Sequence, residues 1–246
     1  MTPNVATADM ARRAASLALV GALLASPTLA GDRALIDYLG YSEDGRYFAF
    51  EEFGVQDGSG FPFSNIYVVD LPADSWVSGT PVRITLEDEM AHVGDARAAA
   101  REEAGAALDT YGIDTAVHQL AVNGDGEAAT DLHELRFGRP GYGLGEPIDP
   151  VILSLETFAA NSPQDCALYL GEPAVGFTLL RDGEEIYSDS EMLPNSRGCP
   201  MDYRLHAVVA PAEWSGAGGG RVAIIASYPF GFEGPDRRFI AVPLPD

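Results

Sequence analysis

Basic residues are scarce in this sequence, and lysine is absent from it. The 15 basic residues are all arginines, against 37 aspartates and glutamates, which gives a formal net charge of −22 at pH 7. A surface this acidic repels phosphate backbones and anionic lipid headgroups. We therefore expect no nucleic acid among its partners and no anionic membrane surface.

Long apolar runs are also missing, except for one near the start of the chain. Arg12 and Arg13 precede an apolar run over residues 14–25, and the small residues of 27–30 form a cleavage point. Such a run is typical of a signal peptide and too short to span a membrane. We expect residues 1–30 to be a signal peptide and residues 31–246 to be a single mainly-β domain without a transmembrane segment. The mature protein is then periplasmic or secreted.

Cysteine occurs only twice, as Cys166 and Cys199. In an exported chain an even number of cysteines favours a disulfide, and two cysteines allow one pairing. A metal site needs more ligands than this pair, and the nearest histidine, His206, has no partner at ligand spacing. The sequence therefore predicts a Cys166–Cys199 disulfide.

The residue patterns of common catalytic sites are mostly lacking. A serine hydrolase of the elbow type needs Gly-x-Ser-x-Gly before a helix, and Gly58-Ser59-Gly60 is only part of that pattern. The four histidines form no two-histidine metal pair; they are His92, His118, His133 and His206. We therefore predict no catalytic residue, no metal and no cofactor.

One acidic loop has the spacing of a calcium site. Oxygen-bearing residues recur in 123–127 and continue with Asp131 and Glu134, but Ala128 stands where a calcium loop needs glycine. We interpret the Asn123-Gly124 pair as a plain turn.

The chain is organised around strands near its start. Residues 35–41, 46–53 and 66–71 are rich in the aromatic and β-branched residues of strands, and a glycine-rich loop over 54–64 separates the last two. In the second strand both alternating sets are apolar, so both faces are expected to be covered. The pair Glu51-Glu52 then marks the point where this strand is expected to meet water. Because successive strand residues point to opposite faces, the pair does not form an acid–base dyad.

An alanine-rich stretch predicts one helix over 95–111. Asp95 is its expected N-cap and Gly112 its C′ residue, with an alanine stripe facing a sheet and Arg97 and Arg101 on the other face. Most other segments read as short strands, at 82–86, 117–122, 132–137, 151–158, 174–181 and 185–188, with a primed turn at 181–184. The fold class is mainly β, with antiparallel propeller-like or sandwich-like sheets and one Ala-rich α-helix.

The two ends of the chain follow one plan. Residues 220–244 repeat the order of residues 45–71: a glycine, an apolar strand, a loop with phenylalanine and glycine, and a second apolar strand. Chance similarity between β-meanders is the alternative. If the ends are copies, placing them side by side closes a propeller-like body and hides its edges.

Three long strings of residues carry a resemblance. They are 45–62, 196–205 with Ser196-Arg197-Gly198-Cys199-Pro200 and Tyr203-Arg204-Leu205, and 231–239. Through them the chain resembles a family of uncharacterised, predicted secreted bacterial proteins, and its ends look like blades of TolB-type propellers. The resemblance implies a secreted protein of unknown activity and supplies no catalytic residues.

We interpret the protein as a binding or interaction module of the cell envelope. An envelope hydrolase and a structural envelope component are the alternatives, and the partner is an unknown envelope protein or ligand. Long loops of the two similar ends are expected to build one surface from carboxylates, arginines and aromatic side chains. The candidate binding residues are Glu51, Glu52, Asp57, Phe61, Phe63, Phe230, Phe232, Arg237 and Arg238.

Overall fold

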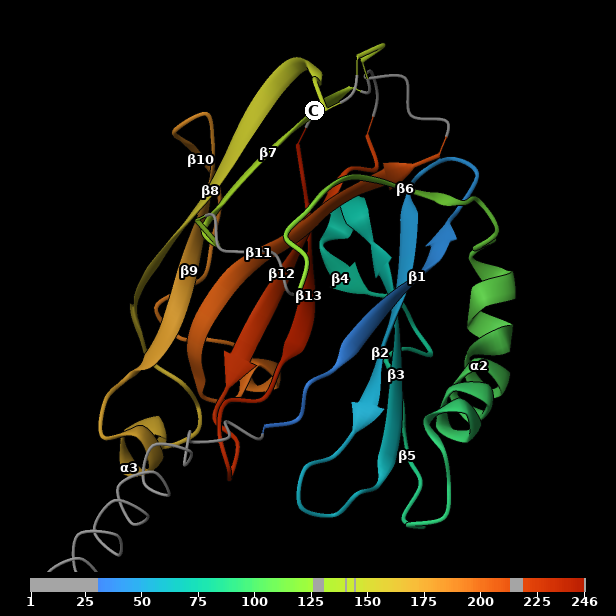
Figure 1. The fold of residues 1–246 in the computed structure, drawn as a ribbon, viewed down its shortest axis with the longest axis vertical. Coiled ribbons are helices and arrows are strands. Elements are labelled where there is room, and N and C mark those ends of the chain that lie inside the picture. The colour runs from blue at the N-terminus through green and yellow to red at the C-terminus, as the bar shows by residue number, and fades with distance from the viewer. Residues whose placement is uncertain (1–30, 126–130, 140, 144, 213–218, 246) are drawn as a thin grey trace, which may run out of the picture. The chain divides into compact units, whose positions relative to one another are not determined.

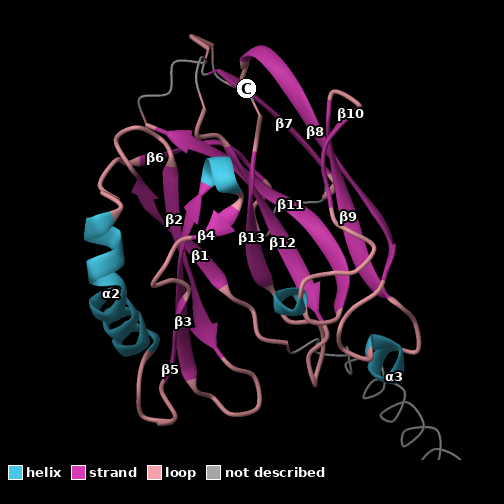
Figure 2. Ribbon diagram, turned by 180° about the vertical axis from the view of Figure 1, so that it is seen from behind, coloured by secondary structure: helices cyan, strands magenta, loops and turns pink. Residues whose placement is uncertain are grey.

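The computed structural model describes residues 31–125, 131–139, 141–143, 145–212 and 219–245. The predicted signal peptide lies outside the described residues. Within them the chain is mainly β with antiparallel sheets, as the sequence predicts, and it forms three sheets and two α-helices where one helix was expected (Figures 1 and 2). No helix of this described part is long and apolar enough to cross a membrane.

The first sheet, called the N-terminal sheet below, is built from the first third of the chain. Its strands are β1 (Leu35–Tyr41), β2 (Tyr47–Val55), β3 (Pro62–Asp70), β4 (Ser75–Trp76) and β5 (Val82–Thr85). The order is β1-β2-β3, with β4 and β5 both pairing with β3. β3 begins at Pro62 rather than Ile66, because Val55 pairs with Pro62 and so extends the ladder into the expected loop. A proline is tolerated there as the first residue of a strand.

The other two sheets come from the rest of the chain. The middle sheet has the order β13-β12-β11-β6 and consists of β6 (Val117–Val122), β11 (Pro200–Pro211), β12 (Val222–Pro229) and β13 (Arg238–Pro243). The outer sheet has the order β10-β9-β8-β7 and consists of β7 (Glu134–Arg139), β8 (Ile148–Ala160), β9 (Ala174–Arg181) and β10 (Glu184–Ser188). The predicted primed turn between β9 and β10 is confirmed, since Asp182 and Gly183 have φ angles of 51° and 84°.

The middle sheet is covered on both faces. Val222 and Ile224 of β12 pack in one core against the N-terminal sheet, while their neighbours Ala223 and Ile225 pack in a second core against the outer sheet. This alternation follows the period of two of a strand, and it stacks the three sheets face to face. The fold is therefore sandwich-like, and the propeller-like alternative is not confirmed. The two similar ends form the hairpins β2–β3 and β12–β13, which belong to different, facing sheets.

Helix α2 (Val93–Thr110) lies on the outer face of the N-terminal sheet (Figure 1). Its alanine stripe is buried as predicted, and Gly112 follows it with a φ angle of 62°. The predicted N-cap is wrong: the helix starts earlier, His92 is the cap, and the Asp95 carboxylate accepts a hydrogen bond from the His92 N–H at 2.8 Å. The short helix α3 (Cys166–Leu170) and the short strand β4 are absent from the sequence prediction.

Candidate functional site

Glu51 and Glu52 of β2 are both buried, with exposed fractions of 0% and 1%. The expectation that this pair meets water is therefore wrong. The strand does not reach solvent there because helix α2 covers one of its faces and β13 of the middle sheet covers the other. The expectation that the two carboxylates point to opposite faces is confirmed.

The Glu51 carboxylate faces helix α2. Its oxygens accept hydrogen bonds from Arg97 Nε at 2.9 Å, Arg101 Nη2 at 2.8 Å and Ser64 Oγ at 2.8 Å, and Asp37 shares both arginines. Burial works to raise the pKa of Glu51, but the hydrogen bonds from the two arginines and the serine outweigh it and lower that pKa. Arg97 and Arg101 therefore bind the sheet rather than forming the free face of the helix, and this ion-pair network is structural.

The Glu52 carboxylate faces the middle sheet. Oε1 accepts hydrogen bonds from Asn65 Nδ2 and the Tyr67 hydroxyl, both at 2.9 Å, and Oε2 accepts one from the Phe239 N–H at 3.0 Å. Burial and the Glu52 charge raise the pKa of Tyr67, so its hydroxyl stays a donor. Glu52 thus joins β2, β3 and β13 at the bottom of a cavity.

This cavity, called the intersheet cavity below, has a volume of about 600 Å³. It is lined by residues of β2 to β5 of the N-terminal sheet, by the end of β12 and by β13 of the middle sheet, by Tyr187 of β10, and by residues shortly before β11. Alternate residues of β3 form its floor, namely Phe63, Asn65, Tyr67 and Val69. Seven strand residues span about 20 Å, so the cavity is a long cleft of the size that small ligands occupy.

Arg197 also lines the intersheet cavity, and its side chain is only 10% exposed. Nη2 donates to Asp189 Oδ1 and to the Tyr187 hydroxyl, both at 3.0 Å, and the guanidinium lies over the ring of Phe177 at 5.4 Å. Nη1 is buried and has no hydrogen-bond partner among the described residues. The Arg197 side chain also interacts with the buried hydroxyl of Tyr203, so its guanidinium is held inside the protein rather than presented to the cavity.

A second guanidinium, that of the exposed Arg83, lines the cavity as well. Arg83 of β5 lies over the rings of Trp76 and Tyr67, at 5.5 Å and 5.9 Å from their centroids. It forms no salt bridge with any carboxylate of the described chain. The exposed Asp74 also lines the cavity, and its pKa is raised because the surrounding protein partly removes it from water, while the charge of Arg197 lowers it only in part.

The predicted charged residues lie in three places. Glu51 faces helix α2, Glu52 and Arg238 line the intersheet cavity, and Arg237 faces Asp125. Arg238 lies over the ring of Phe63 at 4.9 Å and pairs with Asp32 rather than with Glu51 or Glu52. Asp57 is tied to the same place, because its N–H donates to Asp32 Oδ1 at 2.5 Å. Arg237 points elsewhere, to Asp125 at 2.6 Å and to the Ala34 carbonyl at 2.9 Å. The charged candidate residues are therefore distributed over different parts of the structure rather than gathered on one surface.

The predicted phenylalanines are divided as well. Phe63 lines the intersheet cavity together with Glu52 and Arg238, whereas Phe61 lies half-buried in the β2–β3 loop outside it. Phe230 and Phe232 are 43% and 97% exposed on the β12–β13 loop, and Phe230 contacts the ring of Tyr169 from α3 at 5.9 Å. The binding role of these residues stays a prediction.

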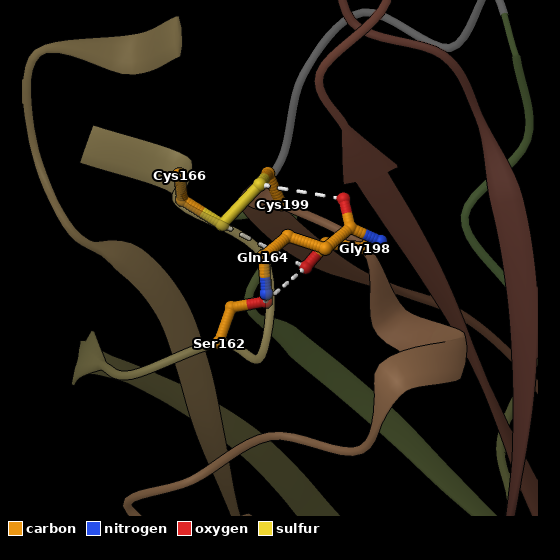
Figure 3. The surroundings of a disulfide bond; sticks show 5 residues. All are labelled: Ser162, Gln164, Cys166, Gly198 and Cys199. Atoms are coloured by element: carbon orange, nitrogen blue, oxygen red, sulfur yellow. Dashed lines mark hydrogen bonds between the residues drawn. A yellow bond between two sulfur atoms is a disulfide. The ribbon is translucent and has the colours of Figure 1, made fainter. Parts of the chain in front are cut away.

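The predicted Cys166–Cys199 disulfide is confirmed (Figure 3). It ties α3 to the start of β11, and Ser162 Oγ adds a hydrogen bond to the Gly198 carbonyl at 2.9 Å. Because Arg197 directly precedes Gly198, the disulfide also fixes the segment that brings this arginine to the cavity.

The acidic loop after β6 lies partly outside the described residues. Of its described members, Asn123 donates from Nδ2 to the Leu205 carbonyl at 2.9 Å, and Asp125 pairs with Arg237. No group of three or more metal-ligating side chains occurs in the part of the chain that the structure describes.

Sequence reasoning missed most of the residues that line the cavity, above all Asp74, Trp76, Arg83 and Arg197. The sequence did contain one signal that points to this cavity. The three strings that carry the family resemblance all reach this cavity: 45–62 supplies Glu52, 196–205 supplies Arg197, and 231–239 supplies Arg238.

The family described as "Predicted secreted protein (DUF2259)" matches residues 49–244, which include β13 and most of β2 and everything between them. The chain belongs to this family. No curated protein and no solved structure matches it. Membership in a family of predicted secreted proteins agrees with the expected location of the protein in the periplasm or outside the cell.

Proposed function

We propose that this predicted secreted protein is a binding module of the cell envelope, and that its ligand occupies the intersheet cavity. The observation that carries the proposal is the cavity itself: a cleft of about 600 Å³ that has both aromatic and polar walls. Binding sites in proteins combine a mostly apolar cleft with a few fixed polar groups. Phe63, Tyr67 and Trp76 supply the aromatic area here, and Asn65 and Arg83 supply polar groups.

The polar groups are held in place before a ligand arrives. Asn65 and Tyr67 are fixed by Glu52, and Arg83 lies over the rings of Trp76 and Tyr67. Such fixed groups lose little conformational freedom on binding, which favours affinity.

The proposal treats residues 31–246 as a single domain. The likeness of the two hairpins to TolB-type propeller blades stays a prediction, and binding in the cavity does not depend on it. The envelope hydrolase also stays an alternative: the cavity lining has no histidine or cysteine, but it includes three serines and the carboxylates of Glu52 and Asp74.

A fragment-binding comparison tests the proposal. The half-buried Ala241 of β13 lines the cavity, and Ala241→Trp fills part of it. Ala98→Trp adds the same side chain on the exposed face of α2 and serves as the control. Ligand-observed NMR with a library of anionic, neutral and cationic fragments should find members that bind the wild type and Ala98→Trp but not Ala241→Trp. If the three proteins bind the same fragments, the cavity is not a binding site.

A further inference from the structure

We propose that the protein docks a basic, amphipathic segment of a partner protein on an exposed apolar surface beside its disulfide. Six of the fourteen exposed large apolar side chains of the described chain lie on the segments that meet there, and we call them the disulfide patch: Leu168, Tyr169, Met192, Met201, Phe230 and Phe232. These six side chains are separate from the residues that line the intersheet cavity, so the inference goes beyond the proposed function.

The disulfide patch is assembled by contacts between distant parts of the chain. The Cys166–Cys199 disulfide joins α3 to the residue before β11 (Figure 3), and the Phe230 N–H donates to the Cys199 carbonyl at 2.9 Å. The ring of Phe230 contacts that of Tyr169 at a centroid distance of 5.9 Å. Helix α3 and the β12–β13 loop therefore lie at the same end of the molecule in both views (Figures 1 and 2).

Two exposed methionines lie on neighbouring segments of the same structure. Met201 is the second residue of β11, and Met192 precedes Leu193, which packs with both cysteines in one small core. Methionine side chains adapt their shape to a partner, and methionine and aromatic residues are enriched where proteins bind one another. The exposed side chains of the patch are thus of the types that form interfaces.

The loop that carries the two phenylalanines is closed before a partner arrives. The Asp236 N–H donates to the Pro229 carbonyl at 2.9 Å, and a Cβ atom at Gly231 would clash with the Gly234 carbonyl oxygen. Phe232 is nevertheless 97% exposed on this loop. Clustered apolar side chains that the fold leaves in water mark interaction sites, and a ring on a closed loop loses little conformational freedom on binding.

The charges beside the disulfide patch favour a basic partner. Residues 162–173, 190–193 and 229–234 contain no arginine, and their four carboxylates are all exposed, at Asp165, Glu172, Glu191 and Glu233. Lysine or arginine next to the apolar side chains of a partner would complement these carboxylates. A second copy of the chain would instead bring the same carboxylates together, and an anionic membrane would be repelled. The occupant is therefore an apolar segment flanked by basic residues.

The test uses the full mature protein and short labelled peptides of leucine and lysine as probes. One peptide alternates the two residues as a strand does, and the other places them on opposite faces of a helix. Each has two controls, in which serine replaces leucine or glutamate replaces lysine. Fluorescence polarisation measures binding.

We expect at least one leucine–lysine peptide to bind the wild type at least about 10-fold more tightly than either of its controls. The variant with Tyr169→Ser and Phe232→Ser should lose at least about 10-fold of this affinity at an unchanged melting temperature. Phe232→Ser alone, at a fully exposed ring, decides the matter if the double variant is less stable. Tyr142→Ser removes an exposed aromatic side chain between β7 and β8 and should have no effect.

The carboxylates are tested in the same way. The variant with Glu191→Gln and Glu233→Gln should bind the peptide at least about 3-fold more weakly at low salt. The variant with Glu43→Gln and Glu184→Gln removes two exposed charges elsewhere and should bind as the wild type does. Equal losses in both variants would mean that only the overall negative charge holds the peptide, which overturns the proposal.

Other results would overturn the proposal as well. It is wrong if neither peptide binds more tightly than its controls, or if Tyr142→Ser weakens binding as much as the substitutions in the patch. Sedimentation velocity and flotation with phosphatidylcholine vesicles test the other occupants: self-association or vesicle binding that Phe232→Ser abolishes would assign the patch to a second copy or to a membrane. Ala241→Trp should leave peptide binding unchanged, so the proposed ligand site in the intersheet cavity holds or fails independently.

Discussion

Glu51 and Glu52 are consecutive residues whose carboxylates are fully buried on opposite faces of one sheet. Glu51 holds helix α2 to the N-terminal sheet through arginines, whereas Glu52 joins this sheet to the backbone of β13. Buried carboxylates are rare unless they are paired or fully hydrogen-bonded, and here each has three or more donors. The pair therefore fastens three successive layers of the fold.

Glu52→Gln should destabilise the protein by about 1 to 3 kcal/mol. The amide keeps one acceptor, but its NH₂ group must face either the Phe239 N–H or the Asn65 and Tyr67 donors, and a buried donor is then left unsatisfied. Urea unfolding at neutral pH measures the change. Glu43→Gln, at an exposed turn position, should stay within about 0.5 kcal/mol of the wild type. Equal stability of the wild type and Glu52→Gln would show that these three hydrogen bonds contribute no net stability.

Acid should weaken the attachment of helix α2. The native pKa of Glu51 is lowered from its ordinary value of 4.5, so the unfolded state takes up this proton first as the pH falls. Its contribution to stability is complete above pH 4.5 and is lost as the pH falls through 4.5 towards the lower native pKa. Glu51→Gln should therefore lose less stability than the wild type between about pH 6 and pH 3 in urea titrations. Glu156→Gln, exposed on β8, should keep the wild-type slope; an unchanged slope in Glu51→Gln contradicts the assignment.

The strands of this fold could be predicted because alternation and turn residues are local signals. Asp182-Gly183 and the alanine stripe of α2 gave the correct hairpin and the correct helix face. The predicted strand boundaries were wrong where contacts between residues far apart in the chain override the local sequence pattern. Pro62 and Phe63 follow a glycine-rich loop, yet pairing with Val55 and Gly54 makes them part of β3.

The site was predictable only in fragments. Glu52, Phe63 and Arg238 were named from the sequence and do line one cavity. Arg197 and Trp76 were not, because nothing in the local pattern shows that residues so far apart in the chain approach across the edges of two facing sheets. The burial of Glu51 was missed for the same reason: its partners Arg97 and Arg101 lie on a helix that reads as amphipathic with those arginines outside.

Loss of the disulfide should cost the protein about 3 to 4 kcal/mol, since the bond closes a loop between residues separated by 33 positions. The variant with both Cys166→Ser and Cys199→Ser should unfold at correspondingly lower urea, and reductant should affect the wild type but not this variant. Alkylation of the exported wild type without reductant, followed by mass measurement, should find no free thiol. Two alkylated cysteines would contradict a bond in the mature protein.

Asp32 connects the loop of the β2–β3 hairpin to the loop of the β12–β13 hairpin. Its carboxylate accepts hydrogen bonds from the Asp57 N–H and from Arg238 Nη2 at 2.8 Å, and its own N–H donates to Asp236 Oδ1 at 2.9 Å. With a side chain only 12% exposed, Asp32→Ala should cost about 1 to 3 kcal/mol and speed hydrogen exchange of the Asp57 amide. Asp149→Asn removes the charge of a carboxylate that is 78% exposed and paired with Arg139, and asparagine tolerates the φ of 50° there, so stability should change by less than about 1 kcal/mol. If both variants lose the same stability and the exchange of Asp57 is unchanged, the two loops are not joined through Asp32.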